Sequence, residues 1–518
     1  MWWMLAGMVL VAGQVDSGYV GRVDTVGATT YDWWFNGPVH RDIVNAPGYG
    51  IHIVWMYSAE LSGTSFPDRN MRYDFFDYAT SAWNWIDPDF MQSGVNVFPE
   101  RAGYGNIGAD PATGAAIICG HGGSPIHPII ARDIAPDAGI FEYAEGTPIA
   151  DGYQWPVIAV GQNGIIHVLG MTAAYGLGYT RIVTWPTFDS LIGGFGPTSF
   201  PTYNIAASKV SPKVYVCWTD NGTPVERAYS RLSEDGGTTW GPVTELIAPP
   251  AYGGDTVTSF HITSLFPFYD MQDRLHVAAN VIPVVHDTGY IMPAEVWHWC
   301  PDNSPAWSEI HRAGCAPENM LGGVGYNAAF ACRPSMGEDA TGNLYVTWEQ
   351  FDSANVEPLT GFLRAGVWMA VSPDNGATWN PGMRLTPENT ASHRFPCIVD
   401  WIGSDGPVVL YLMDPIAGFF VQGEHEGVEC PVICQWTAAS GIQDEPATNP
   451  GTTFRIWPNP ASQKLHIAGG QRLVLLDVAG RERMKLHDGT NDIAALPPGI
   501  YVVRDELTRL SRKLVVRP

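Results

Sequence analysis

Residues 233–240 and 372–379 decide the fold, because the same eight-residue pattern occurs in both. They read SEDGGTTW and SPDNGATW, and each matches S-x-D-x-G-x-T-W without a mismatch. An Asp carboxylate can accept backbone N–H groups and close a turn, and Gly can adopt the left-handed backbone that such a turn needs. The Thr and Trp suit packing between neighbouring sheets. We therefore interpret Asp235 and Asp374 as turn formers and not as catalytic residues.

A longer unit recurs around these turns. It consists of an apolar strand, a turn with Gly or Asp, and a second strand rich in Val, Ile, Tyr and Trp. Seven second strands are expected, at residues 51–56, 115–119, 165–171, 214–218, 275–279, 344–348 and 408–412. Intervals of roughly 45–65 residues are typical of propeller blades. The predicted fold class is all-β, with a propeller of six to eight blades, seven as the best estimate, and a small C-terminal β-sandwich.

The eight-residue pattern resembles the Asp box, or BNR repeat, of sialidase-like β-propellers. Its defining residues are Ser233, Asp235, Gly237, Thr239, Trp240, Ser372, Asp374, Gly376, Thr378 and Trp379. In that family the boxes lie on the outer rim, away from the active site. The resemblance therefore implies that the chemistry of this chain lies elsewhere on the ring.

The end of the chain carries a second resemblance. Its segments FRIWPNPASQKLHI (454–467), LVLLDV (473–478), LPPGIYVV (496–503) and RKLVV (512–516) are short strands separated by turns, which indicates a small β-sandwich. In their order they resemble the type A sorting domain of the type IX secretion system. The resemblance implies export by that machinery, removal of the domain, and a secreted or outer-cell-surface location.

Charge marks the boundary between the two parts. From Phe454 onward the chain has 11 of its 28 basic residues but only 6 of its 52 acidic residues. The start, MWWMLAGMVLVAG, is typical of a signal peptide, with a buried first strand as the alternative. We predict a signal peptide at 1–14, the Asp-box propeller at 30–437, a linker at 438–453 and the sorting domain at 454–518.

Composition excludes some partners. The net charge of −24 argues against nucleic acid, because binding phosphates requires clustered Lys and Arg. No later apolar run reaches the ~18 residues of a membrane span, so no transmembrane segment is predicted. Eight Cys permit disulfides, with Cys300/Cys315 and Cys430/Cys434 as the best local pairs, and we interpret the other four as isolated buried thiols. No metal site and no cofactor are predicted.

Each of four repeat units has an arginine at or near the start of its first strand: Arg41, Arg101, Arg333 and Arg394. In a seven-bladed ring these four units would be neighbours. Converging on one side of the channel mouth, the four arginines would bind a carboxylate or a phosphate. Sialidases use an arginine triad for the sugar carboxylate, so the resemblance points the same way. The alternative is that these arginines pair with acidic neighbours and fix contacts between blades.

Candidates for catalysis are weaker. A retaining sialidase needs a Tyr nucleophile with a Glu partner and an Asp acid/base, and Asp42, Tyr326 and Glu349 fall in suitable segments. The F-R-I-P motif that the family carries early in the chain is missing. We therefore expect a secreted or cell-surface propeller that binds an extracellular glycan or protein. The alternatives are an exo-sialidase-like glycoside hydrolase and a purely structural envelope protein.

Overall fold

The computed structural model describes residues 18–146, 152–172, 176–198, 201–220, 227–251, 257–388, 390–437, 455–457, 461–468, 472–477, 481–505 and 511–517. The predicted signal peptide and linker lie outside these residues. The chain divides into two compact units, residues 1–439 and 440–518. The described helices are single 3₁₀ turns: η1 (Phe90–Gln92), η2 (Gln162–Gly164), η3 (Pro317–Asn319) and η4 (Phe420–Gln422). None of them is long and apolar enough to cross a membrane.

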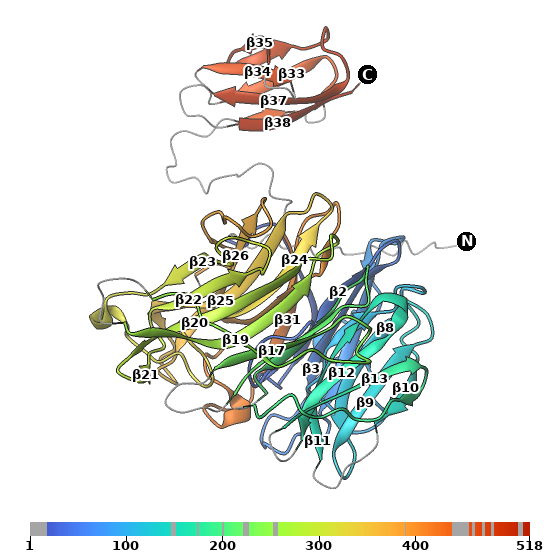
Figure 1. Ribbon diagram of the computed structural model, residues 1–518. Coiled ribbons are helices and arrows are strands. Elements are labelled where there is room, and N and C mark those ends of the chain that lie inside the picture. The colour runs from blue at the N-terminus through green and yellow to red at the C-terminus, as the bar shows by residue number, and fades with distance from the viewer. Residues whose placement is uncertain are drawn as a thin grey trace. The chain divides into compact units, whose positions relative to one another are not determined.

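The first unit is a propeller whose described residues form seven sheets, the blades (Figure 1). From the inner strand outward, blade 1 has β2 (Ile43–Ala46), β3 (Gly50–Tyr57), β4 (Asn70–Asp77) and β5 (Ala82–Trp83), with β6 (Val95–Asn96) also on β4. Blade 2 has β7 (Ile107–Ala109), β8 (Ala116–Gly122), β9 (His127–Asp133) and β10 (Phe141–Glu145). Blade 3 has β11 (Tyr153–Val160), β12 (Ile166–Thr172), β13 (Leu177–Thr184) and β14 (Thr187–Phe188). Blade 4 has β15 (Tyr203–Ala207), β16 (Val214–Thr219), β17 (Ala228–Ser233) and β18 (Thr244–Leu246).

The remaining blades follow the same order. Blade 5 has β19 (Ser259–Tyr269), β20 (Leu275–Val285), β22 (Ala294–Trp299) and β23 (Trp307–Ala313), with β21 (Thr288–Gly289) on β20. Blade 6 has β24 (Ala331–Asp339), β25 (Leu344–Val356), β26 (Leu363–Ser372) and β27 (Met383–Arg384), with β29 (Trp401–Ile402) parallel to β24. Blade 7 has β28 (Ser392–Ile398), β30 (Val408–Asp414), β31 (Cys430–Trp436) and, outermost, β1 (Arg22–Thr29).

Blade 7 closes the ring with strands from both ends of the propeller. Strand β1 pairs antiparallel with β31, from Arg22 opposite Trp436 to Thr29 opposite Cys430. The propeller therefore begins before the predicted start at residue 30. The physical reason is that the N-terminal strand forms the outer strand of the last blade. No strand edge is then left unpaired where the two ends of the ring meet.

The second strand of every blade coincides with one of the seven predicted segments. These strands are β3, β8, β12, β16, β20, β25 and β30. They read as continuous apolar runs because blades pack on both of their faces; every residue of β3 and of β16 is buried. Since all blades repeat one connectivity, all inner strands begin on the same face of the ring.

Both Asp-box segments form the same turn between the third and fourth strands of their blades. Asp235 accepts hydrogen bonds from the Thr239 backbone N–H (2.8 Å) and hydroxyl (2.6 Å), and Asp374 does the same with Thr378. Trp240 packs edge-on against Tyr179 of the preceding blade, with ring centroids 4.8 Å apart. These hydrogen bonds agree with the expected role of Asp235 and Asp374 as turn formers. Both turns lie on the face of the ring where the inner strands end.

All eight cysteines are free thiols. The local pairs that the sequence favoured are therefore not bridged. Cys430 and Cys434 lie four residues apart on one extended strand, which places them about 13 Å apart, beyond the ~7 Å limit between the Cα atoms of a disulfide.

The second unit is a small sandwich of two antiparallel sheets with its own apolar core. One sheet holds β32 (Arg455–Trp457), β33 (Lys464–Ala468) and β36 (Gly489–Asp492). The other holds β35 (Glu482–Leu486), β34 (Leu473–Asp477), β37 (Gly499–Asp505) and β38 (Ser511–Val516). The Pro458–Pro460 turn of the sorting-domain resemblance lies outside the described residues.

Candidate functional site

Four inner strands carry the same backbone irregularity at or just before their start. Tyr104, Trp155, Arg333 and Phe395 have φ between +48° and +56°, a left-handed conformation that bulky side chains rarely adopt. In β11, β24 and β28 these residues lie in β-bulges and precede proline. Bulges re-aim side chains and are frequent beside functional sites, and backbone strain also clusters there. We call the face of the ring where these residues lie the bulge face.

The segment between β1 and β2 covers the propeller axis on the bulge face. Trp33, Trp34 and Phe35 are buried in it, and Trp34 stacks on Phe395 of blade 7. The same segment accepts hydrogen bonds from blade 4, where the Asn204 side chain donates to the carbonyl of Val39, and from the loop before blade 6. We call residues 30–40 the plug segment.

Arg333 and Arg394, two of the four predicted arginines, meet at one carboxylate. Arg333 Nη1 and Arg394 Nε (3.2 Å) both donate to Glu349, and the backbone N–H of Phe395 adds a third bond at 2.9 Å. Burial alone would raise the pKa of Glu349, but the charges of the two arginines outweigh it and lower the pKa to about 2. The side chains of both arginines are only 2% exposed. This group of residues, which we call the clamp, joins blades 6 and 7. For these two arginines it matches the alternative stated above, in which they pair with an acidic neighbour and fix contacts between blades.

The other predicted catalytic residues do not join the clamp in a common site. Asp42 is buried just before β2, and burial raises its pKa well above the usual value. Tyr326 is 55% exposed and packs edge-on against Trp33 of the plug segment. Among the described residues, no carboxylate forms a hydrogen bond with Tyr326.

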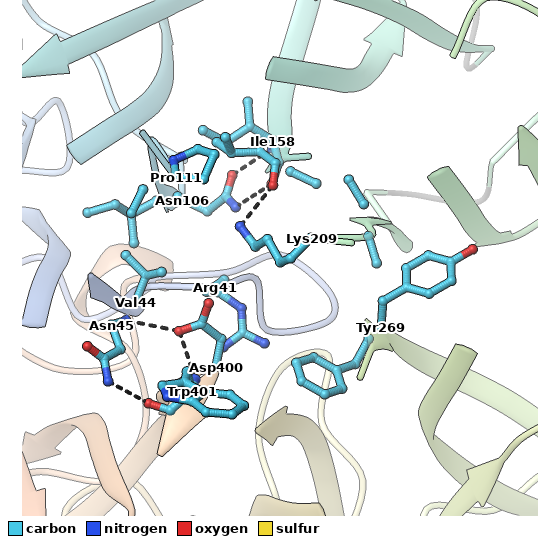
Figure 2. Close-up of a pocket in the computed structure, with 18 of the residues that line it drawn as sticks. Arg41, Val44, Asn45, Asn106, Pro111, Ile158, Lys209, Tyr269, Asp400 and Trp401 are labelled. Atoms are coloured by element: carbon cyan, nitrogen blue, oxygen red, sulfur yellow. Dashed lines mark hydrogen bonds between the residues drawn. The ribbon is translucent and has the colours of Figure 1, made fainter. Parts of the chain in front are cut away.

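Arg41 lines a funnel (Figure 2). Its walls include the ends of the inner strands, which places it on the face opposite the bulge face. The funnel has a volume of about 490 Å³, within the range of small-molecule pockets. Its charged groups are engaged inside the protein. Arg41 donates to the carbonyls of Ile398 (3.0 Å) and Met336 (2.9 Å), Lys209 donates to the carbonyl of Val160, and Asp400 accepts the backbone N–H of Asn45. The funnel therefore has the volume of a ligand site but few uncommitted charges.

Arg101 belongs to a different group on the bulge face, between blades 1 and 2. Its Nε donates to the carbonyl of Phe66 (2.8 Å), and Arg69 lies beside it with its guanidinium 5.0 Å from the ring of Tyr104. The hydroxyl of Tyr104 contacts the hydroxyl of Tyr31 from the plug segment, and His121 packs against the ring of Tyr104. We call Tyr31, Arg69, Arg101, Tyr104 and His121 the arginine–tyrosine cluster.

The arginine–tyrosine cluster is rich in hydrogen-bond donors. His121 Nδ1 accepts the backbone N–H of Trp155 (2.8 Å), so the proton of the neutral ring lies on Nε2. Burial, aided by the charges of Arg69 and Arg101, lowers the pKa of His121 to about 3. Burial, aided by Tyr31, raises the pKa of Tyr104 well above its usual value. At neutral pH the imidazole of His121 and the phenol of Tyr104 are therefore uncharged.

Neither arginine of this cluster has a carboxylate partner among the described residues. Arg69 is 8% exposed and makes one side-chain hydrogen bond, from Nε to the carbonyl of Ala102 (3.2 Å). Burial and the charge of Arg69 lower the pKa of Arg101, as expected for like charges held side by side. In a protein of net charge −24, two adjacent arginines without a counterion are a candidate site for an external anion.

Sequence reasoning found one member of this cluster and missed four. Arg101 stood out through its position before an inner strand, but Arg69 lies between the second and third strands of blade 1 and has no equivalent in the aligned units. His121 lies in the stretch GHGGS at 120–124, where no neighbouring residue in the sequence suggests a partner for it.

No family model matches the chain, and no curated protein matches it. Among solved structures, a PL25 ulvan lyase bound to -[GlcA(1-4)Rha3S]- aligns at 13% identity and a TM-score of 0.47, covering 80% of this chain and 96% of the lyase. The BP39L lectin from Burkholderia pseudomallei aligns at 13% identity and a TM-score of 0.44, covering 78% and 98%. An α-L-arabinanase from Penicillium chrysogenum aligns at 12% identity and a TM-score of 0.37, covering 67% and 94%. These similarities are too low to assign a substrate or a reaction.

Proposed function

We propose that the protein binds an acidic glycan at the arginine–tyrosine cluster on the bulge face. The observation that carries this proposal is the pair Arg69 and Arg101, which lie side by side without a carboxylate partner among the described residues. Arg69 is buried and Arg101 is exposed. A buried cation without a counterion is costly, so an anionic ligand that reaches Arg69 past Arg101 would stabilise the site as well as gain affinity from it. The chemical group expected there is a carboxylate or a sulfate.

The remaining members of the cluster suit the same ligand. The Nε2–H of His121 points to no acceptor among the described residues, and one of the two phenolic protons of Tyr31 and Tyr104 stays free when the other is shared between them. Charge-assisted hydrogen bonds to an oxyanion are the strongest that such donors make. The cluster is therefore matched to an anion and not to a cation or a neutral amide.

Aromatic side chains near the cluster favour a sugar over a peptide as the carrier of that anion. Tyr104 and Trp155 line one small pocket with Asn36 of the plug segment, and Tyr326 is exposed on the same face. Flat rings that combine an apolar face with a polar edge suit the C–H faces and hydroxyls of a pyranose. A uronate-containing or sulfated chain would engage both features.

Binding is favoured over hydrolysis because the cluster contains no carboxylate. Most glycoside hydrolases need a pair of Asp or Glu residues beside the scissile bond. The predicted sialidase-type activity would have to use Glu349, which Arg333 and Arg394 hold in the buried clamp. Release of fluorophore from a fluorogenic sialoside would support that activity, and we expect none.

Eliminative cleavage of a uronate chain is a second candidate, favoured by the contact between the Tyr31 and Tyr104 hydroxyls beside Arg69. In this reaction a base removes the proton α to the carboxylate, the glycosidic oxygen leaves from the adjacent carbon with a proton, and a C=C bond forms. Arginine would stabilise the charge that develops on the carboxylate. A rise in ultraviolet absorbance from the unsaturated product distinguishes cleavage from binding alone.

Calorimetric titration of the full chain with uronate-containing, sulfated and neutral oligosaccharides tests the main proposal. We expect binding of the acidic ligands only, and a loss of about 10- to 100-fold in affinity for Arg101→Ala, since one charged hydrogen bond contributes about 1.5–3 kcal/mol. Arg231→Ala is the matched control, because Arg231 also bonds backbone carbonyls without a carboxylate partner but lies in blade 4 near an Asp box. Equal affinity of both variants for acidic ligands would contradict the proposal.

We also propose export through the type IX secretion machinery and a secreted or outer-surface location. The support is the ordered series of C-terminal motifs and the separate core of the small sandwich. Removal of residues 454–518 should leave the protein inside an expressing Bacteroidetes cell. Detection of the truncated chain at the cell surface would contradict the proposed export route.

A further inference from the structure

Three side chains with metal-ligand chemistry meet on the bulge face of blade 7, apart from the arginine–tyrosine cluster. Asp32 comes from the plug segment, Asp414 from the end of β30, and His425 from the connection between β30 and β31. One ligand atom of each lies within 4.8 Å of the others. Asp32 and Asp414 are each 1% exposed, and the side chain of His425 is fully buried. Exposed acidic groups often gather by chance, but these three are inside the protein.

Two atoms of the group have no partner. His425 Nδ1 lies 2.7 Å from the carbonyl oxygen of Glu426, so Nδ1–H donates and Nε2 keeps its lone pair. That Nε2 lies 3.5 Å from Asp32 Oδ2, where two acceptors face each other. Nε2 of His425 and Oδ2 of Asp414 are buried without any hydrogen-bond partner among the described residues. Unpaired buried acceptors are costly, and both of these are aimed into the same small space.

No arginine or lysine among the described residues forms an ion pair with either of the two buried carboxyl groups, Asp32 and Asp414. Arg394 is the cation whose charge acts on both carboxyls, but its guanidinium is bonded to Glu349. A bound dication would compensate both carboxylates and accept the free lone pairs.

We propose that Asp32, Asp414 and His425 bind a divalent metal ion of the zinc class. A histidine nitrogen and only three protein ligands suit Zn²⁺, whereas Ca²⁺ takes six to eight oxygen ligands. With bonds of about 2.0–2.2 Å, two ligands of a tetrahedral zinc ion lie about 3.4 Å apart, which agrees with the 3.5 Å between His425 Nε2 and Asp32 Oδ2. Water would fill the fourth position.

Hydrogen bonds from outside the group orient two of the three ligands. The backbone N–H of Phe420 and of Val421 donate to Asp32, and the thiol of Cys430 lies 3.6 Å from Asp414 Oδ1. The sulfur of Cys430 is the donor in this contact with Asp414. Such outer partners are typical of built metal sites.

The location gives this ion a structural role. Asp32 follows three residues after β1, the strand that closes the ring, while Asp414 and His425 belong to the blade that β1 joins. The ion therefore cross-links the N-terminal segment to the last blade at the point of closure. It would also hold Phe419 and Phe420 against the plug segment, where Phe419 packs on Trp33.

Metal analysis of the full chain, purified without chelator and without a histidine tag, tests the site. We expect about one zinc per chain, a melting temperature that falls by several degrees after chelation, and recovery with Zn²⁺ but not with Ca²⁺ or Mg²⁺. Zinc-free protein from the purification, together with no thermal response to added Zn²⁺, would overturn the proposal.

The Asp414→Asn variant separates metal binding from simple packing. It removes a buried charge, so without metal it should melt at or above the temperature of the chelated wild type, yet it should no longer respond to Zn²⁺. His425→Gln should lose the same response. His393→Gln is the matched control, because His393 is a fully buried histidine of the same blade that contacts Tyr19 instead, and it should keep the response. A zinc response retained by Asp414→Asn would place the ion elsewhere and overturn the assignment.

Discussion

Glu349 shows how one buried carboxylate can organise two blades. Residues of opposite charge that are removed from water contribute stability only when their geometry is good and their remaining hydrogen-bonding atoms are satisfied. Here Arg333, Arg394 and the backbone N–H of Phe395 all donate to it. The guanidinium carbons of the two arginines also lie over the ring of Phe395, 4.9 and 5.5 Å from its centroid. Phe395 is one of the bulge residues with a left-handed backbone. The clamp is a structural unit, in contrast to the unpaired arginines of blades 1 and 2.

The Glu349→Gln substitution should destabilise the propeller by about 3–5 kcal/mol, because it leaves two buried guanidinium groups without a counterion. Urea unfolding of the variant measures this loss. Glu142→Gln, which breaks the exposed pair with Arg132, is the control and should change stability by less than about 1 kcal/mol. Similar small losses in both variants would contradict the clamp.

The same residue predicts a pH dependence. Its folded pKa of about 2 lies below the usual value of 4.5, so its contribution to stability is complete above pH 4.5 and is lost as the pH falls from 4.5 towards 2. Thermal melts across this window should show a steeper loss for the wild type than for Glu349→Gln. Parallel slopes for the two proteins would mean that Glu349 is not ionised in the fold.

At the scale of elements, the ring has two functionally different faces. Turns of the Asp-box type connect outer strands on the face where the funnel lies, and their hydrogen bonds stay within the turn. The bulge face carries the left-handed inner-strand residues, the plug segment and the arginine–tyrosine cluster. The left-handed residues of the inner strands and the two arginines without carboxylate partners among the described residues thus lie on the bulge face, and the hydrogen-bonded Asp-box turns lie on the other face.

The Asp235→Ala substitution should separate the two faces. It removes the hydrogen bonds to the Thr239 backbone and hydroxyl and should cost about 1–3 kcal/mol of stability. Affinity for an acidic glycan should stay within about twofold of the wild type, because the turn lies on the other face. Chemical unfolding and calorimetry on one preparation measure both quantities. A loss of affinity without a loss of stability would show that the Asp box takes part in binding.

Strand patterns in the sequence predicted the elements far better than the site. The second strands could be located because they are buried on both faces and therefore mostly apolar, as in β3 and β16. Strand β1 was missed because its partner β31 lies at the other end of the propeller, and no local pattern encodes that pairing. Arg69, His121 and Tyr31 were missed for the same reason: their proximity arises from the closed ring and not from spacing along the chain.

At the scale of the molecule, the propeller and the small sandwich have separate cores. The apolar clusters of residues 1–439 contain no residue of the second unit, and the cluster centred on Leu465, Leu475 and Leu514 contains none of the first. Independent cores are what allow a C-terminal domain to be removed without loss of the rest.

Removal of residues 440–518 should therefore leave the melting temperature of the propeller within about 2 °C of the full chain, because the strands that close the ring, β1 and β31, both belong to the first unit. Removal of residues 1–29 should instead abolish cooperative unfolding, since blade 7 loses its outer strand. Differential scanning calorimetry of the two truncated chains compares them. A large loss of stability on removing the sandwich would contradict the independence of the units.

Acidic-glycan recognition through unpaired arginines is tested most directly with one ligand in two forms. A uronate-containing polysaccharide and the same polymer with its carboxylates chemically reduced to alcohols differ only in the group that Arg69 and Arg101 would bind. Calorimetry on the wild-type chain should show binding of the first form, weakening with added salt, and a loss of at least about tenfold in affinity for the second. Equal affinity for both forms would contradict the assignment of the arginine–tyrosine cluster.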